Sequence, residues 1–251
     1  MRKKSFIVGG MRWLTNELGS WRKEPLVPML LLVIAGSLWA FAEISDLVGE
    51  PRAFDRNILL AMREADDLSQ PIGGPRTGEM MRDFTALGGF TILTAITLAG
   101  IAAVCFLKRW KAAVILASAV GGGSLLATFA KASFDRIRPD VVPHVVHVSS
   151  PSFPSGHSMN AAVVYLTIAL LLARRRTLRP LRWFLIFLAV IIVLAVGISR
   201  LYLGVHWPTD VLAGWSLGAA WALLMRIVVE KIDPREKGVD EFPPDGHAAK
   251  G

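Results

Sequence analysis

The sequence predicts an all-α fold, a polytopic membrane bundle of six transmembrane helices with an interfacial helix in the first outer loop. Three observations predict this fold class. Of the 251 residues, 53% are hydrophobic and 19% are charged, and the mean hydropathy is +0.47. The apolar residues are gathered into runs close to the roughly 20 residues that a helix needs to cross a bilayer. The basic residues are concentrated in alternate connections between these runs.

Six apolar runs are bounded by charged or turn residues, and we expect the two shorter ones, the fourth and fifth, to extend by a turn. The runs cover approximately residues 26–44, 86–107, 112–130, 158–173, 183–199 and 211–229. They define a six-span domain over 26–231, preceded by a basic segment over 1–25. The polar tail over 232–251 has three prolines and no apolar period, and we expect it to be disordered. The first run resembles a signal peptide near Ala40, but its 25-residue leader favours a retained anchor.

Lys and Arg are unevenly divided between the two sets of connections. The N-terminal segment, the turns at 108–111 and 174–182, and the end of the chain from Arg226 hold 19 of the 28 basic residues. Because short basic connections stay inside the cell, we expect both termini to be cytoplasmic and the loops 131–157 and 199–210 to face outside. The net charge of +8 then matches an anionic inner membrane surface and does not imply a nucleic-acid partner.

The first outer loop, residues 45–85, carries acidic as well as basic residues. One helical face within it would gather four apolar side chains, those of Phe54, Ile58, Leu59 and Met62. This pattern is typical of an interfacial helix that lies on the outer leaflet of the membrane.

Glycines occur at helical spacing in two of the predicted spans. Gly214 and Gly218 form a G-x-x-x-G pair, and residues 121–123 are a glycine triplet in the middle of the third span. Both patterns predict close packing between helices. The triplet would alternatively suit an unwound, transporter-like helix.

Basic residues gather in the first half of the loop 131–157. Lys131, Arg136 and Arg138 lie on the predicted outer side, against the bias that keeps bases inside. Their presence there calls for an anion, which would be either a ligand or a lipid headgroup that anchors the loop.

A second cluster, P-S-G-H, immediately precedes the fourth span. Ser155 and Gly156 at a helix entrance offer a hydroxyl, backbone N–H groups and the positive end of a helix dipole, which suit a phosphate or an oxyanion. His157 follows in the first turn. The alternative is an ordinary serine N-cap beside an interfacial histidine.

A third cluster leads into the sixth span. Pro208 suits the first turn of a helix, which leaves His206 just outside it and lets the side chain of Asp210 reach back. A carboxylate bonded to one imidazole nitrogen fixes the tautomer and leaves the other nitrogen basic. The alternative is that Asp210 only caps the helix. Arg200 adds another outer guanidinium without an acid in its own loop.

The three clusters together favour chemistry on a phosphate. If the spans are neighbours, cations and helix N-termini would hold a tetrahedral dianion, one histidine would attack phosphorus and the other would protonate the departing oxygen. This describes a metal-free phosphomonoester or diphosphate hydrolase. A zinc site at His144 and His147 is the alternative, although the sequence shows no further ligands for it.

In order and spacing, three motifs resemble the signature of the type 2 phosphatidic acid phosphatase superfamily. They are K-x6-R-P (Lys131, Arg138, Pro139), P-S-G-H (Pro154 to His157) and S-R-x5-H-x3-D (Ser199, Arg200, His206, Asp210). With the apolar runs included, the resemblance covers residues 26–229. Within the superfamily, the chain is similar to the bacterial six-span membrane branch.

The resemblance implies a role for each signature residue. His206 would be the nucleophile that forms a phosphohistidine, Asp210 its orienting partner and His157 the general acid. The phosphoryl oxygens would be bound by Lys131, Arg138, Ser155, Gly156 and Arg200. The resemblance also implies a phosphatase that needs neither a metal nor another cofactor.

An outward site at the membrane surface implies a lipid phosphate or diphosphate as substrate. Undecaprenyl diphosphate, phosphatidylglycerol phosphate, phosphatidic acid and lipid A phosphates all fit. We expect a multi-pass protein of the bacterial inner membrane with its active site facing the periplasm or the cell exterior. The alternatives are a lipid phosphotransferase that uses the same phosphohistidine and a non-catalytic transporter or binder of lipid phosphates. The sequence leaves the oligomeric state open.

Overall fold

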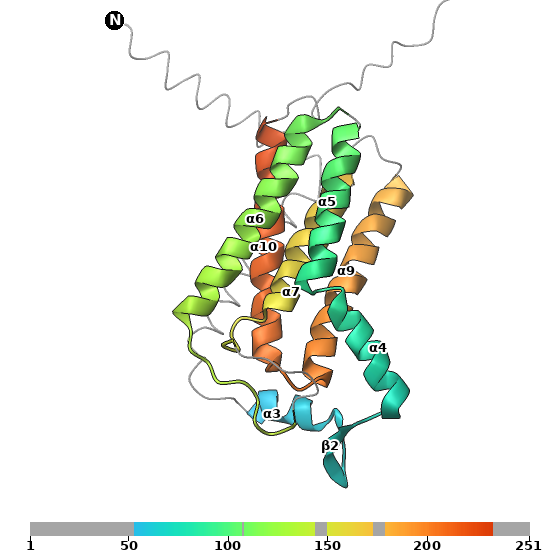
Figure 1. Ribbon diagram of the computed structural model, residues 1–251, viewed down its shortest axis with the longest axis vertical. Coiled ribbons are helices and arrows are strands. Elements are labelled where there is room, and N and C mark those ends of the chain that lie inside the picture. The colour runs from blue at the N-terminus through green and yellow to red at the C-terminus, as the bar shows by residue number, and fades with distance from the viewer. Residues whose placement is uncertain (1–52, 107, 144–149, 173–178, 233–251) are drawn as a thin grey trace, which may run out of the picture.

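The computed structural model describes residues 53–106, 108–143, 150–172 and 179–232 of the chain (Figure 1). Its elements are helices and one short antiparallel hairpin. In chain order they are α3 (Ala53–Leu60), β1 (Arg63–Glu64), β2 (Asp67–Pro71), α4 (Gly74–Ala86), α5 (Phe90–Phe106), α6 (Trp110–Ser133), α7 (Gly156–Ala161), the π-helical segment η1 (Ala162–Leu166), α8 (Thr167–Leu172), α9 (Arg179–Tyr202) and α10 (Pro208–Ile232). Because α7, η1 and α8 follow one another without a break, they form one helix over Gly156–Leu172.

Each predicted span that falls on described residues coincides with a helix. Helices α6, α9 and α10 are long and apolar enough to cross a membrane, and α4 with α5, bent by 47°, adds a fourth span if the pair is one. The helix Gly156–Leu172 is apolar but shorter. The first predicted span, 26–44, with its signal-peptide alternative, lies outside the described residues, as do 1–25 and 233–251. The count of six spans therefore stays a prediction.

The helices form a bundle around the helix Gly156–Leu172. Figure 1 shows α5, α6, α9 and α10 running alongside one another, with α3 and the hairpin at one end of the bundle, here called the α3 end. The four residues at the junction of α7 and η1 are no more than 1% exposed: Ala161, Ala162, Val163 and Val164. Large apolar side chains on the outward faces of α6 and α9 are exposed, as expected of helices that contact lipid.

The G-x-x-x-G pair brings α10 against α7. A Cβ atom on Gly218 would lie 2.6 Å from the carbonyl oxygen of Met159, and one on Gly214 would lie 2.7 Å from the carbonyl oxygen of Ser155. Any side chain at either position would force the two backbones apart. The predicted close packing at these glycines is confirmed.

Two glycines of the triplet serve the packing of α6 in the same way, whereas a Cβ atom on Gly121 would meet nothing within 4 Å. A Cβ atom on Gly122 would lie 2.6 Å from the ring of Trp221 on α10, and one on Gly123 would lie 2.7 Å from Val163. The Trp221 indole donates a hydrogen bond to the carbonyl oxygen of Ala119 (2.7 Å). Because α6 is helical throughout, the alternative of an unwound helix is wrong.

The segment predicted as the first outer loop differs, over its described residues 53–85, from the prediction of a single interfacial helix in an all-α fold. Helix α3 ends at Leu60, before Met62, and a hairpin and α4 follow it. Leu59 is fully buried against Leu201, Trp207 and Val211, whereas Phe54 is 53% exposed, so only part of the predicted apolar face packs on the protein. Gly73 and Gly74 have φ angles of +86° and +72°, a conformation that favours glycine and lets the chain turn from β2 into α4.

Candidate active site

The three polar clusters of the sequence meet at the α3 end of the bundle, where α6 and α9 end and α7 and α10 begin. The backbone N–H of Ser155 at the start of α7 donates to the carbonyl oxygen of Asp210 on α10 (3.0 Å). The loop after α6 reaches the connection between α9 and α10 through Arg138, which donates to the carbonyl oxygen of Val205 (2.5 Å). The prediction that these loops are neighbours is therefore correct.

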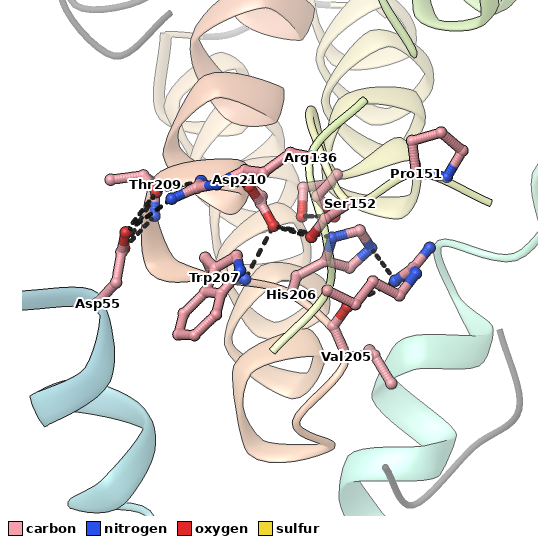
Figure 2. A network of polar contacts seen from close by, with 12 residues as sticks. Asp55, Arg136, Pro151, Ser152, Val205, His206, Trp207, Thr209 and Asp210 are labelled. Atoms are coloured by element: carbon pink, nitrogen blue, oxygen red, sulfur yellow. Dashed lines mark hydrogen bonds and ion pairs between the residues drawn. The ribbon is translucent and has the colours of Figure 1, made fainter. Parts of the chain in front are cut away.

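His206 and Asp210 lie as the sequence predicts. Helix α10 begins at Pro208, and the Asp210 carboxylate turns back so that its Oδ2 atom lies 3.4 Å from His206 Nδ1. The same oxygen accepts the Trp207 backbone N–H (2.9 Å) and the Ser152 hydroxyl (Figure 2). Asp210 therefore caps the helix and faces the imidazole at once, so the two interpretations of this residue hold together.

The contacts of His206 define which ring nitrogen carries the proton. Its Nε2 atom lies 3.3 Å from Arg138 Nη1. Because a guanidinium can only donate, Nε2 is the acceptor and Nδ1 carries the hydrogen that points to Asp210. The imidazole therefore presents a lone pair on Nε2, next to a cationic side chain.

Burial keeps this imidazole neutral. His206 is 1% exposed, and burial lowers its pKa from the usual 6.5 to about 4. The hydrogen bond and negative charge of Asp210 raise this pKa, while the charges of Arg200 and Arg138 lower it, and burial outweighs Asp210. At neutral pH the Nε2 lone pair is therefore available.

Lys131 and Arg138 converge on one short segment. Lys131 Nζ donates to Ser150 Oγ (3.2 Å) and to the carbonyl oxygen of Pro151 (3.3 Å). Arg138 donates to the carbonyl oxygen of Ser150 (2.8 Å) and to its hydroxyl (3.2 Å). Burial lowers the pKa of Arg138. Two cations thus meet at one hydroxyl, and one of them, Arg138, also contacts His206.

The P-S-G-H segment differs in one detail from the expected cradle of backbone N–H groups. The N–H of Ser155, at the N-cap of α7, is used by the Asp210 carbonyl, and the Ser155 side chain makes no capping bond but accepts the Ser158 hydroxyl (2.9 Å). Gly156 lets Lys131 approach, because a Cβ atom there would lie 3.2 Å from Lys131 Cε. The N-terminus of α7 is therefore tied to α10 on one side and covered by Lys131 on the other.

His157 lies among the same cations in the first turn of α7. After burial, the groups that act on it electrostatically are the cations Arg200, Lys131 and Arg138 and the imidazole of His206. Arg200, in the last turn of α9, is 3% exposed and donates to the Thr85 hydroxyl on α4 (2.9 Å). All eight residues expected to form the site thus lie at the α3 end: His206, Asp210, His157, Lys131, Arg138, Ser155, Gly156 and Arg200.

Arg136 differs from the other cations of its cluster, because its anion is supplied by the protein. Its guanidinium forms salt bridges with Asp210 (2.6 Å) and with Asp55 on α3 (3.1 Å). Arg136 is therefore shared by two carboxylates, of which Asp210 also faces His206. The sequence did not single out Asp55 or Ser152; the signal for Asp55 was an acid one turn before the apolar Leu59 on α3.

A helical membrane bundle with a histidine, its carboxylate partner and several cations at one end defines a class of protein whose site suits a phosphoryl group. The family model of the PAP2 superfamily matches residues 89–233, so the chain belongs to the PAP2 superfamily. The resemblance found in the sequence is thereby confirmed.

Relatives of the chain include named lipid phosphatases. Phosphatidylglycerophosphatase B of Bacillus subtilis is 41% identical over 160 residues, which are 63% of this chain and 78% of that protein. Lipid A 1-phosphatase of Rhizobium etli is 34% identical over 128 residues, 47% of this chain and 50% of that protein, so the chain spans about half of it. The crystal structure of a transmembrane PAP2 type phosphatidylglycerolphosphate phosphatase from Bacillus subtilis has a TM-score of 0.72 at 34% identity, covering 80% of this chain and 97% of that one. The chain is thus a PAP2-type membrane protein related to lipid phosphatases.

Proposed function

We propose that the protein is an integral membrane lipid phosphatase that hydrolyses a lipid phosphomonoester or diphosphate through a phosphohistidine on His206. The observation that carries this proposal is the setting of His206. Its Nδ1 faces a carboxylate and its Nε2 faces Arg138, so a neutral nucleophile stands beside a cation that can hold the group to be attacked.

The first half of the reaction transfers the phosphoryl group to the protein. His206 Nε2 forms a bond to phosphorus while the bond from phosphorus to the lipid oxygen breaks, and Asp210 stabilises the positive charge that develops on the ring. Burial and the neighbouring cations lower the pKa of His157 in the free protein. The phosphate dianion raises this pKa when it binds beside the ring, so His157 takes up a proton and gives it to the departing lipid oxygen. In the second half, His157 takes a proton from water, the water oxygen attacks phosphorus and the N–P bond breaks. Inorganic phosphate leaves and both histidines regain their first state.

The remaining residues of the site would bind the phosphoryl oxygens. Lys131 and Arg138 already donate to the Ser150 hydroxyl, and a phosphate oxygen is a stronger acceptor that can take its place. Arg200, Ser155 and Gly156 complete the binding set that we propose. None of these groups requires a metal ion, and we propose that hydrolysis is metal-independent and uses no cofactor.

The substrate class follows from the membrane setting and the relatives. Phosphatidylglycerol phosphate, undecaprenyl diphosphate, phosphatidic acid and lipid A phosphates each present a phosphate at a membrane surface, and the names of the relatives include phosphatases of glycerophospholipid and lipid A phosphates. The decisive experiment offers these lipids in detergent to the purified protein and measures released inorganic phosphate. Label transferred to a second lipid would indicate the phosphotransferase instead, and binding without either product would indicate a transporter or binder.

We further propose that the site faces the periplasm or the cell exterior from the bacterial inner membrane. The support is the excess of Lys and Arg in the opposite set of connections. Reporter fusions in the loop 174–182 and at the C-terminus should both be active in the cytoplasm. A periplasmic signal at either position would reverse the orientation.

A further inference from the structure

We propose that Asp55 on α3 is a positioning residue for this reaction, which holds Arg136 and thereby sets the charge that Asp210 presents to His206. The inference rests on the proposed roles of His206 and Asp210. Asp55 lies outside the three motifs of the sequence, and its described contacts are with Arg136 and Thr209 rather than with the histidines.

Asp55 lies on the side of Asp210 that faces Arg136, away from His206. Its side chain is completely buried. The carboxylate accepts Arg136 Nη2 (3.1 Å), the backbone N–H of Thr209 (3.0 Å) and the Thr209 hydroxyl (2.9 Å). Because Thr209 is next to Asp210 on α10, these bonds fix the backbone from which the Asp210 side chain projects.

Arg136 connects the two carboxylates. Its Nη1 donates to Asp210 Oδ1 (2.6 Å) and to the Thr209 hydroxyl (2.7 Å), while Nη2 donates to Asp55, and the side chain is 3% exposed. Figure 2 shows the resulting series of contacts from Asp55 through Arg136 and Asp210 to His206. Positive and negative groups alternate along it.

This alternation determines how strongly Asp210 acts on the imidazole. A guanidinium shared by two carboxylates is neutralised in part by Asp55, so Asp210 keeps more of its negative potential for His206. Without Asp55 the full charge of Arg136 would act on Asp210, and the imidazole would become less basic and less nucleophilic. Without Arg136 the opposite shift is expected, because nothing would offset Asp210 from behind.

The other charged and titratable groups around His206 stay constant in this comparison. Arg138, in the loop after α6, contacts its Nε2 atom, and Arg200 acts on it electrostatically from α9. His157 on α7 interacts electrostatically with both His206 and Lys131. None of these contacts Asp55 among the described interactions. A change in the titration of His206 on substitution of Asp55 would therefore report the Asp55–Arg136 pair.

The test uses four variants of the full chain in detergent: Asp55→Asn, Arg136→Gln, the double variant, and Asp67→Asn as a control. Asp67 lies in the same outer loop but is exposed and bonds only to nearby Ser69 and Gln70. Two properties are measured on each: lipid phosphate turnover, and the titration of His206 by NMR of histidine-labelled protein. The NMR measurement does not depend on activity.

Asp55→Asn should lower kcat by about 10- to 100-fold, as loss of a partner behind an orienting group commonly does, with KM within about twofold. The His206 titration should move to lower pH in Asp55→Asn and to higher pH in Arg136→Gln. The double variant, which restores the charge balance, should titrate closer to wild type than either single variant. Asp67→Asn should match wild type in both measurements.

Three results would overturn the proposal. One is a His206 titration in Asp55→Asn equal to that of the control, with kcat reduced only in proportion to the folded fraction. Another is a raised KM at unchanged kcat. If Asp55→Asn does not fold, Arg136→Gln is compared with the double variant instead. The third refuting result is a double variant in which the added Asp55→Asn substitution does not reverse the shift that Arg136→Gln causes in the His206 titration. Inactive wild type would count against the proposed function, while the NMR titration would still test the role of Asp55.

Discussion

Asp210→Asn removes a charge and keeps the size of the side chain. In the structure the carboxylate accepts four donors, from Trp207, Ser152, Arg136 and His206. An amide has one acceptor oxygen, and its NH2 group would have to face a donor, either the Arg136 guanidinium or the Nδ1–H of His206. In either orientation the buried Arg136 loses the charge of Asp210, and where the NH2 group faces His206 the imidazole also loses its acceptor.

The size of both effects follows from the contacts. Replacing the corresponding acid of a serine protease triad by its amide costs about 10⁴ in kcat. Here Nδ1 and Oδ2 are 3.4 Å apart, longer than a strong N–H···O bond, so we expect a loss of about 10² to 10⁴ in kcat. Removing one partner of a buried ion pair costs about 3–5 kcal/mol of unfolding free energy. Since typical domains have only about 5–15 kcal/mol, the variant should also be distinctly less stable.

The assay must separate these two losses. Turnover is measured with a lipid phosphate at saturating concentration, well below the unfolding temperature of the variant, and is divided by the folded fraction from thermal unfolding in detergent. Asp67→Asn, an exposed change of the same chemistry, is the control. A folded Asp210→Asn protein with kcat within tenfold of wild type, or with a change confined to KM, would refute the role of Asp210.

Three further predictions concern the histidines and the metal. His206→Ala should leave essentially no turnover, whereas the turnover of His157→Ala should fall by about 10²- to 10⁴-fold. With p-nitrophenyl phosphate, if this substrate is accepted, His157→Ala should recover much of this loss, because a good leaving group needs no proton. Phosphate label trapped on His157 after quenching would reverse the two roles. Because burial lowers the pKa of His206 to about 4 from 6.5, the unfolded chain binds the extra proton between these values. The contribution of His206 to stability should be full above pH 6.5 and fall as the pH drops towards 4, and thermal unfolding of His206→Gln should lack this pH dependence. In the pH profile of kcat/KM, the limb that reports His206 should lie near pH 4. A limb near pH 6.5 would contradict the burial argument. Activity should survive EDTA and be inhibited by vanadate, and loss in EDTA with recovery in magnesium would contradict a metal-independent reaction.

Much of the helical frame and the site could be predicted from the sequence. The apolar runs that fall on described residues coincide with helices, and each of these runs is bounded by charges or turn residues. Pro208 begins α10 as its fixed φ angle predicts. Asp210 could be paired with His206 because the two residues are four positions apart across a helix start, so local geometry alone brings them together. Spacing of this kind is a short-range property that needs no knowledge of the tertiary fold.

The residues that the sequence did not reveal act over long separations. Asp55 contacts Thr209, 154 positions away, and Ser152 contacts Asp210, 58 positions away. A pattern of apolar residues assigns a face to α3 but does not say what that face will meet. For the same reason the apolar positions of α3 were interpreted as facing lipid, although Leu59 packs against Leu201, Trp207 and Val211.

The contact between α7 and α10 links the packing of the bundle to the geometry of the site. Gly214 allows the carbonyl oxygen of Ser155 to approach α10, and the N–H of Ser155 donates to the carbonyl oxygen of Asp210 in the same place. His157 follows Ser155 by two positions on one helix, and His206 precedes the other helix. Because backbone atoms fix this contact on both sides, the distance between the two histidines depends on the absence of a side chain at Gly214. In the proposed reaction, the glycine that permits close helix packing therefore also determines how the attacking and the protonating histidine are placed around one phosphate.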